Sequence, residues 1–341
     1  MNAALFETMR SNFLAASEFD RRDMKSAFWQ QHLDKKGDIF VDPGLWENFR
    51  TSAISEGLDN ANALERQRHA QRDHARCLEM LRQLEPAIPA ALRPLLEEIP
   101  VGGAQSFLTD GRHVSRSSIE FVWMLTRLLP YLENASVAVE IGGGYGGLAR
   151  LVKSVFPSIR YIILDLPEAS AIQTYYLNRA MPESRFLYAR EIIPELELPV
   201  EADFDFMLVP GSIAERLPDK SIDIFINTRS MMEMDMPIIQ YYFSHMERAL
   251  IPEGRFYCIN RYWKISRLSD YPFDACWYPS IWAPWPLYID PMPHQEILAV
   301  RSRYPISHGV RELLNELPKH PKPKRFKKLL SRIGLRAKTA P

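Results

Sequence analysis

The sequence predicts an α/β fold, a doubly wound and mostly parallel sheet with an N-terminal helical cap region. Two observations carry this prediction. From Val137 onward, short continuous runs of β-branched and aromatic residues recur, which is typical of strands buried on both faces of a parallel sheet. These runs alternate with segments long enough to form crossover helices. The 341 residues suffice for one such domain with an appendage.

Helix is predicted for the first part of the chain. Residues 65–84 contain neither Gly nor Pro, and their apolar side chains follow at helical spacing. Four prolines and the Gly102-Gly103 pair come next, which places a boundary near residue 105. We therefore expect residues 1–105 to form a helical cap or oligomerisation region, so that the protein could be a homo-oligomer.

Residues 106–318 carry the pattern of a Rossmann-like domain. An amphipathic helix is predicted first, and five strands and three crossover helices follow it. Residues 186–189 fit either a further strand or part of an insertion. The predicted strands are 137–141, 161–164, 204–209, 222–226 and 256–259, and the predicted helices are 117–131, 147–156, 167–180 and 237–250.

Aromatic residues and six prolines crowd into an insertion at residues 262–293, which ends before a predicted edge strand at 296–301. The Trp and Tyr side chains could stack against the apolar faces of sugar rings, because they combine a large flat area with a polar group. They could equally pack as the core of a long insertion against the edge of the sheet. The sequence leaves both interpretations open.

Charge and cysteine content indicate a cytoplasmic protein. Lys and Arg number 42, as do Asp and Glu, and a net charge of zero argues against a nucleic-acid binder. The three cysteines are scattered, which suits a reducing compartment and predicts no zinc site. Neither a signal peptide nor an apolar run of 18 residues is found, so we expect no membrane span.

The C-terminal segment, residues 319–341, differs from the rest of the chain. It contains nine Lys or Arg and no Asp or Glu, so the remainder of the protein is net acidic. Within residues 319–336, Phe326, Leu329 and Ile333 lie at helical spacing among the cations. Such a basic amphipathic segment can contact an anionic membrane surface, here the inner face of the membrane. A solvated tail, or a helix docked on a neighbouring subunit, are the alternatives.

A glycine-rich loop is the strongest functional signal. Five glycines lie between residues 142 and 147, directly after a predicted strand and directly before a predicted helix. Glycine lets the backbone approach a ligand closely, and the helix offers unpaired N–H groups. Asp165, at the end of the next strand, could hold the two hydroxyls of a ribose. An NAD-dependent oxidoreductase is therefore one candidate.

Glu140 argues for a different cofactor. Its carboxylate precedes the first glycine by two residues and would repel the pyrophosphate of NAD. A cationic ligand would be attracted there instead. S-adenosylmethionine carries an ammonium group and a sulfonium and has no phosphate. Its ribose would then be held by Asp165, whose two oxygens can each accept a hydroxyl hydrogen bond.

Four motifs between about Val137 and Tyr262 resemble those of class I S-adenosylmethionine-dependent methyltransferases. They are EIGGGYGG, ILDLPE, LPDKSIDIFINTRSMMEM and LIPEGRFYCINRYW. More narrowly, GGGYGGLARL, ILDLPE, INTRSMMEM and GRFYCINR are similar to the sugar O-methyltransferase family of bacterial polysaccharide clusters, and LWENFRTSAISEGLDNA points the same way. The resemblance implies an enzyme that methylates a hydroxyl of a sugar or glycan precursor.

Cofactor contacts are expected along the rim formed by the strand ends. An acid often found beside adenine in the class is absent here, and Gly211-Ser212-Ile213 stands in its place. The expected cofactor-binding residues are Glu140, Gly142, Gly144, Gly146, Asp165, Leu166, Ser212, Ile213 and Asn227.

Catalysis calls for a general base, because a sugar hydroxyl is a poor nucleophile. Glu233 is the first candidate and Asp235 the second, although Asp235 also suits a helix N-cap. His113 is a rival base, and Arg229 could hold a substrate hydroxyl or phosphate. No metal is predicted, since no acidic or histidine cluster has ligand spacing. A cofactor-binding scaffold without catalysis is the alternative outside the enzymes.

Overall fold

The computed structural model describes residues 3–34, 40, 44–51, 63–192, 195–286 and 293–318, with backbone alone at 51 and 63–73. The basic segment 319–341 lies outside the described residues. Within the described part, no helix is long and apolar enough to cross a membrane.

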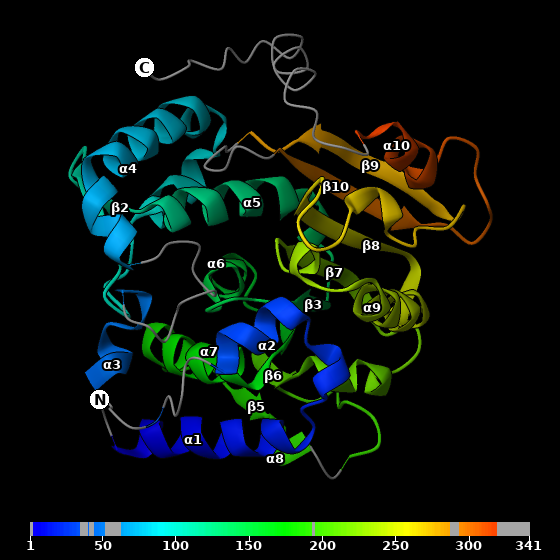
Figure 1. The fold of residues 1–341 in the computed structure, drawn as a ribbon, viewed down its shortest axis with the longest axis horizontal. Coiled ribbons are helices and arrows are strands. Elements are labelled where there is room, and N and C mark those ends of the chain that lie inside the picture. Colours follow the sequence, from blue (N-terminus) through cyan, green and yellow to red (C-terminus); the bar gives the residue numbers. More distant parts are fainter. Residues whose placement is uncertain are drawn as a thin grey trace.

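The predicted fold class is confirmed by an eight-stranded sheet in the order β5-β6-β4-β3-β7-β8-β10-β9 (Figure 1). Seven strands run in one direction and β10 runs against them. The strands are β3 (Val137–Ile141), β4 (Arg160–Asp165), β5 (Phe186–Tyr188), β6 (Phe206–Pro210), β7 (Ile222–Thr228), β8 (Leu250–Arg261), β9 (Trp277–Pro284) and β10 (His294–Arg301).

The expected edge strand at 296–301 is in fact internal. β10 pairs with β8 on one side and with β9 on the other, antiparallel to both. The aromatic insertion supplies the real edge strand, β9, and so completes the sheet. This arrangement differs from an all-parallel dinucleotide-binding sheet, in which the last strand lies at the edge.

Helices cover both faces of the sheet (Figure 1). One face packs against α5 (Arg116–Leu132), α6 (Gly147–Val155) and α7 (Pro167–Ala180). The other packs against α9 (Met236–Ala249) and α10 (Val310–Glu316). Helix α5 begins at a capping box on Ser115, and proline occupies the first turn of α7 and of α9, where its missing N–H costs nothing.

The N-terminal helices share a hydrophobic core with the sheet domain. Helix α1 (Ala3–Glu18) lies along α7, where buried Asn12 donates hydrogen bonds to Ser170 and Thr174. Trp46 and Phe49 are buried in the same core. The remaining helices are α2 (Ala27–Asp34), α3 (Gly44–Glu47), α4 (Ala63–Leu84) and α8 (Ala189–Ile192), and a small hairpin joins β1 (Phe107–Thr109) to β2 (Arg112–Val114). Short 3-10 helices span Arg22–Met24, Phe49–Thr51, Glu85–Ala87, Ala90–Leu96, Gly211–Arg216, Met231–Glu233 and Leu268–Asp270.

The aromatic insertion packs as core. Tyr271, Trp277 and Trp285 are fully buried, and Phe273 stacks edge-on to Phe243 of α9. Residues 287–292 lie outside the described part. None of the described residues of the insertion lines the pocket at the strand ends. Core packing therefore accounts for these buried rings, and none of the described aromatic side chains of the insertion is placed to stack on a ligand in that pocket.

Candidate active site

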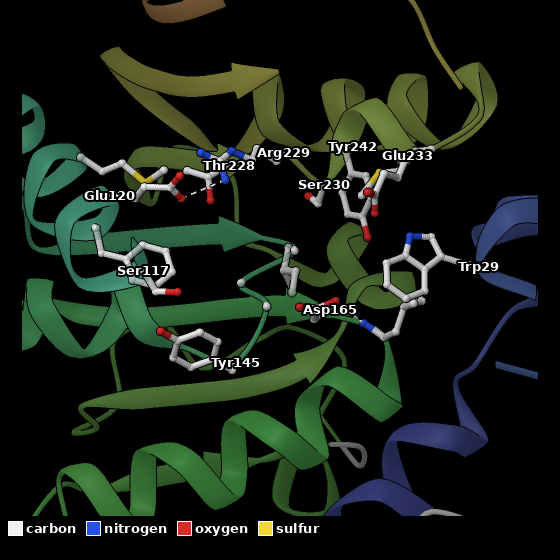
Figure 2. A pocket seen from close by; sticks show the side chains of 18 of the residues that line it. Trp29, Ser117, Glu120, Tyr145, Asp165, Thr228, Arg229, Ser230, Glu233 and Tyr242 are labelled. Atoms are coloured by element: carbon white, nitrogen blue, oxygen red, sulfur yellow. Dashed lines mark hydrogen bonds and ion pairs between the residues drawn. The ribbon is translucent and has the colours of Figure 1, made fainter. Parts of the chain in front are cut away.

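A pocket opens at the carboxyl ends of β3, β4 and β7 (Figure 2). The chain leaves β3 toward β4 on one side and later returns to pair β7 on the other, so the pocket lies at the switch point where ligands bind in open α/β sheets. Five parts of the chain line it: the glycine loop, residues 164–166, the end of β7 with the residues after it, the first half of α5, and Tyr242 of α9. A further wall comes from the N-terminal region, through Met24, Ser26 and Trp29.

The glycine loop brings bare backbone to the pocket floor. Gly142 has φ +74°, and a Cβ added there would lie 2.1 Å from Oγ of Ser230. Gly142 and Gly144 line the pocket, as expected of cofactor contacts. Gly146 does not line it. With φ +90° it is the N-cap of α6 and lies against Leu177, so its role is to start the helix.

Asp165 ends β4 with its carboxylate on the pocket wall (Figure 2). Its Oδ1 accepts from the amide of Leu166 at 2.8 Å, and its Oδ2 accepts from Nε2 of Gln173 at 2.8 Å. Burial raises the pKa of Asp165 to about 7, although these hydrogen bonds oppose the rise. The backbone amides of Gly143 and Gly144 also donate toward this carboxylate, and its place on the pocket wall suits contact with a ribose hydroxyl. Leu166 lies beside it on the same wall.

Glu140 is not on the pocket wall, contrary to expectation. It is 1% exposed, and its Oε2 accepts a hydrogen bond of 2.9 Å from the hydroxyl of Tyr161. A Cβ on Gly143 would lie 3.2 Å from that oxygen, so the carboxyl group sits beneath the glycine loop. Burial raises the pKa of Glu140 to about 8. Glu140 therefore lies behind the loop and outside the pocket lining, whereas the sequence placed it among the cofactor contacts.

Three other expected cofactor contacts also lie outside the pocket lining. Ser212 donates to the carbonyl oxygen of Phe19, because the N-terminal region packs over this part of the rim. Ile213 is buried in the core beneath α9. Asn227 is fully buried and donates to the carbonyl oxygen of Ile141 at 2.8 Å, so it ties β7 to β3.

Of the three candidate bases, only Glu233 lines the pocket. It ends a 3-10 helix after β7, and its side chain is 9% exposed and ion-paired with Lys264. Burial raises the pKa of Glu233, while the charge of Lys264 opposes the rise. Asp235 is exposed at the N-cap of α9 and makes no side-chain cap bond. His113 is exposed on β2. Asp235 and His113 therefore both lie outside the pocket lining, unlike Glu233.

Arg229 lines the pocket and is paired with a residue that sequence reasoning missed. Its Nη1 lies 2.9 Å from Oε2 of Glu120, and Nε of Arg116 lies 3.2 Å from the other oxygen (Figure 2). Burial would raise the pKa of Glu120, but the two arginines outweigh it and lower the pKa to about 2. Glu120 is therefore a permanent carboxylate in the wall of the pocket. In the sequence it looks like one polar position of an amphipathic helix.

Trp29 is the second omission of the sequence analysis. It belongs to α2, and Figure 2 shows its indole on the side of the pocket opposite Glu120. Contacts between distant parts of the chain hold this wall: Lys25 pairs with Glu168 of α7 at 3.4 Å, and Nζ of Lys264 lies 4.8 Å from the ring centre of Phe28. No motif surrounds Trp29, so no local signal could have revealed it.

The pocket fits a nucleoside cofactor. Its floor at Gly142 and Gly144 has no side chains, Asp165 lies where a ribose hydroxyl can reach it, and both carboxylates and arginines line the walls. Residues 107–209 match a family model described as the O-methyltransferase domain. The protein is an S-adenosylmethionine-dependent O-methyltransferase. Neither an NAD-dependent oxidoreductase nor a scaffold without catalysis fits this assignment.

Solved structures similar to this O-methyltransferase are distant from it. A candidate sarcosine dimethylglycine methyltransferase from Galdieria sulphuraria is 14% identical, with a TM-score of 0.42, over 59% of this chain and 95% of that one. The mitomycin 7-O-methyltransferase MmcR is 16% identical, with a TM-score of 0.34, over 70% of this chain and 71% of that one. No curated protein matches the sequence. Similarities of this size say nothing about the substrate.

Proposed function

We propose that this O-methyltransferase methylates a hydroxyl of a sugar or glycan precursor, with Glu233 as the general base. The observation that carries the proposal is the position of Glu233: of the three candidate bases it alone lines the pocket, buried enough for its pKa to be raised. A base of raised pKa removes a hydroxyl proton more readily than an ordinary surface carboxylate does.

The roles of the side chains follow from their places. S-adenosylmethionine, when bound, supplies a methyl group on a positively charged sulfur. Asp165 accepts hydrogen bonds from its ribose, and Trp29 helps to keep water from the pocket. Glu233 would take the proton of the acceptor hydroxyl, whose oxygen would receive the methyl group from that sulfur. Lys264 is a positioning residue that orients the Glu233 carboxylate through their ion pair.

The lining of the pocket supports a polyhydroxylated acceptor. Hydroxyl side chains of Ser26, Ser117, Thr228 and Ser230 border it. Such groups both donate and accept hydrogen bonds, which matches the hydroxyls of a sugar. The similarity of four motifs to sugar O-methyltransferases points in the same direction.

Mass spectrometry tests the proposal. The purified enzyme and S-adenosylmethionine are incubated with sugar nucleotides, glycan fragments and a matched set of phenolic acceptors, and each product is examined for the gain of one methyl group. We expect methylation of at least one sugar hydroxyl, reduced by about 100-fold or more in Glu233→Gln and retained in Asp235→Asn, which changes an exposed carboxylate outside the pocket. Methylation of the phenols alone would overturn the sugar assignment and leave the O-methyltransferase activity intact.

We further propose that the enzyme acts in the cytoplasm, with residues 319–336 bringing it to the anionic inner face of the membrane. Support comes from the sequence, in which cations surround apolar residues at helical spacing. Cosedimentation of the full chain, and of a chain ending at Leu317, with anionic and neutral vesicles tests this. We expect salt-sensitive binding to anionic vesicles by the full chain only, and equal behaviour of the two chains would contradict it.

A further inference from the structure

The wall of the pocket that is formed by α5 and β7 carries a cluster of three charges, which we term the Arg–Glu–Arg cluster: Arg116, Glu120 and Arg229. Figure 2 shows Glu120 and Arg229 on one side of the glycine loop, with Asp165 and Trp29 on the other. All five residues line the same pocket. A ligand whose ribose meets Asp165 and whose chain crosses Gly142 and Gly144 therefore ends at this cluster.

The cluster is held in place by the fold. The backbone of Arg229 has φ +70°, which is unusual for a residue other than glycine. Its amide donates to the carbonyl oxygen of Ile259 at 2.8 Å. Arg116 is the first residue of α5, and Glu120 is 5% exposed one turn later. The two arginine side chains remain partly exposed, at 31% for Arg116 and 14% for Arg229.

The charges match a zwitterion. Two guanidinium groups share one carboxylate, so the cluster keeps one net positive charge and one fixed anion. The N-terminus of α5, a helix of 17 residues, adds the favourable potential that such ends offer to anions. Each oxygen of Glu120 makes one ion pair and retains a lone pair for a further donor.

We propose that the Arg–Glu–Arg cluster binds the amino-acid end of S-adenosylmethionine, with Arg116 and Arg229 facing its carboxylate and Glu120 facing its ammonium group. This proposal concerns the cofactor and does not depend on the acceptor, so its tests are separate from those of the sugar assignment. An anionic group on the acceptor is the competing occupant of the two arginines.

Glu120 takes the part that the sequence analysis gave to Glu140. Both are buried glutamates, but only Glu120 lines the pocket. Their ionisation differs as well, because Glu120 has two arginine partners and Glu140 has the Tyr161 hydroxyl. An anion for the cofactor's ammonium group is thus present in the site, although on a different element from the one expected.

Binding calorimetry with two nucleosides isolates the cluster. S-adenosylhomocysteine carries the amino-acid end, whereas 5′-methylthioadenosine has the same nucleoside and sulfur without it. We expect Arg229→Gln to lower the affinity for S-adenosylhomocysteine at least tenfold, equivalent to about 1.4 kcal/mol. The affinity for 5′-methylthioadenosine should change less than threefold. Unchanged binding of 5′-methylthioadenosine also shows that the variant is folded. Arg112→Gln is the matched control, since Arg112 pairs with Glu85 at 2.7 Å outside the pocket.

Decarboxylated S-adenosylmethionine separates the two halves of the proposal. It keeps the ammonium group and the sulfonium but lacks the carboxylate, so Arg229→Gln should leave its affinity within threefold of wild type. Glu120→Gln should lower the affinity for decarboxylated S-adenosylmethionine at least fivefold. If S-adenosylhomocysteine and 5′-methylthioadenosine respond equally to Arg229→Gln, the proposal is overturned. The same holds if cofactor affinity is unchanged while the KM of the acceptor rises, which would assign the arginines to the acceptor.

Discussion

Two of the walls of the pocket are built in different ways. The wall formed by the ends of β3, β4 and β7 consists of buried strands and a glycine loop in contact with Ser230. The wall formed by α2 contains no buried residue of its own and is held by ion pairs and ring contacts of Lys25 and Lys264. We therefore expect binding geometry to depend on the strand-end wall and access to the pocket to depend on the α2 wall. Substitutions in these two walls should therefore have effects that differ in magnitude and in the property they change.

The largest effect is expected at Gly142 in the strand-end wall. In Gly142→Val, the new side chain would collide with Ser230 and would hold a backbone conformation that β-branched residues avoid. We expect cofactor affinity to fall at least 1,000-fold, measured by calorimetry with S-adenosylhomocysteine. Gly111→Val is the control, because Gly111 has φ +75° but nothing within 4 Å of its added Cβ. Equal losses in both variants would show that strain, and not the collision, is responsible.

Glu233→Gln should lower kcat and leave the affinity for S-adenosylhomocysteine nearly unchanged. Loss of a general base lowers kcat by about 100-fold or more, while S-adenosylhomocysteine affinity stays within threefold. Because burial raises the pKa of Glu233, wild-type kcat should fall as the pH decreases through a value above the ordinary range for glutamate. The acid limb should disappear from the residual activity of Glu233→Gln. A kcat that survives this substitution would contradict the role of Glu233.

Asp165 should give an intermediate effect on binding. Asp165→Ala removes the acceptor of two hydroxyl hydrogen bonds, each worth about 1 kcal/mol, so cofactor affinity should fall about 10- to 30-fold. With a pKa of about 7, wild-type Asp165 ionises as the pH rises through neutrality, and affinity for the cationic cofactor should rise with it. Asp165→Asn should flatten that pH dependence. Glu140→Gln, beneath the loop, should retain it, and the reverse pattern would move the titrating group to Glu140.

The smallest effect is expected in the α2 wall. Lys25→Ala removes the pairs with Asp20 and Glu168, both partly exposed, so the free energy of unfolding should change by less than about 1 kcal/mol. A loosened α2 wall should instead let the cofactor product enter and leave the pocket faster. We expect the dissociation rate of S-adenosylhomocysteine in stopped-flow measurements to rise two- to fivefold. An unchanged rate would mean that α2 plays no part in access, and the two walls would then be equivalent.

Much of the strand-end wall could be predicted from the sequence, because its residues lie in short contiguous motifs whose local structure is dictated by their composition. Continuous apolar runs, the glycines after β3 and the acid at the end of β4 placed Gly142, Gly144 and Asp165 on one rim, and parallel strands bring such ends together. The same reasoning misplaced Glu140, because alternation along a strand does not reveal whether a side chain faces the pocket or the underside of a loop.

The remaining features were decided by the tertiary structure alone. Trp29, Glu120 and Lys264 come from parts far apart in the chain. Their places at or beside the pocket depend on how α2, α5 and the segment after β8 pack around the sheet. The edge strand is β9 and not β10, because the order of strands is set by pairing across the sheet and not by order along the chain. Local composition determines which segments become strands, helices and tight turns, whereas long-range packing determines which of their side chains meet.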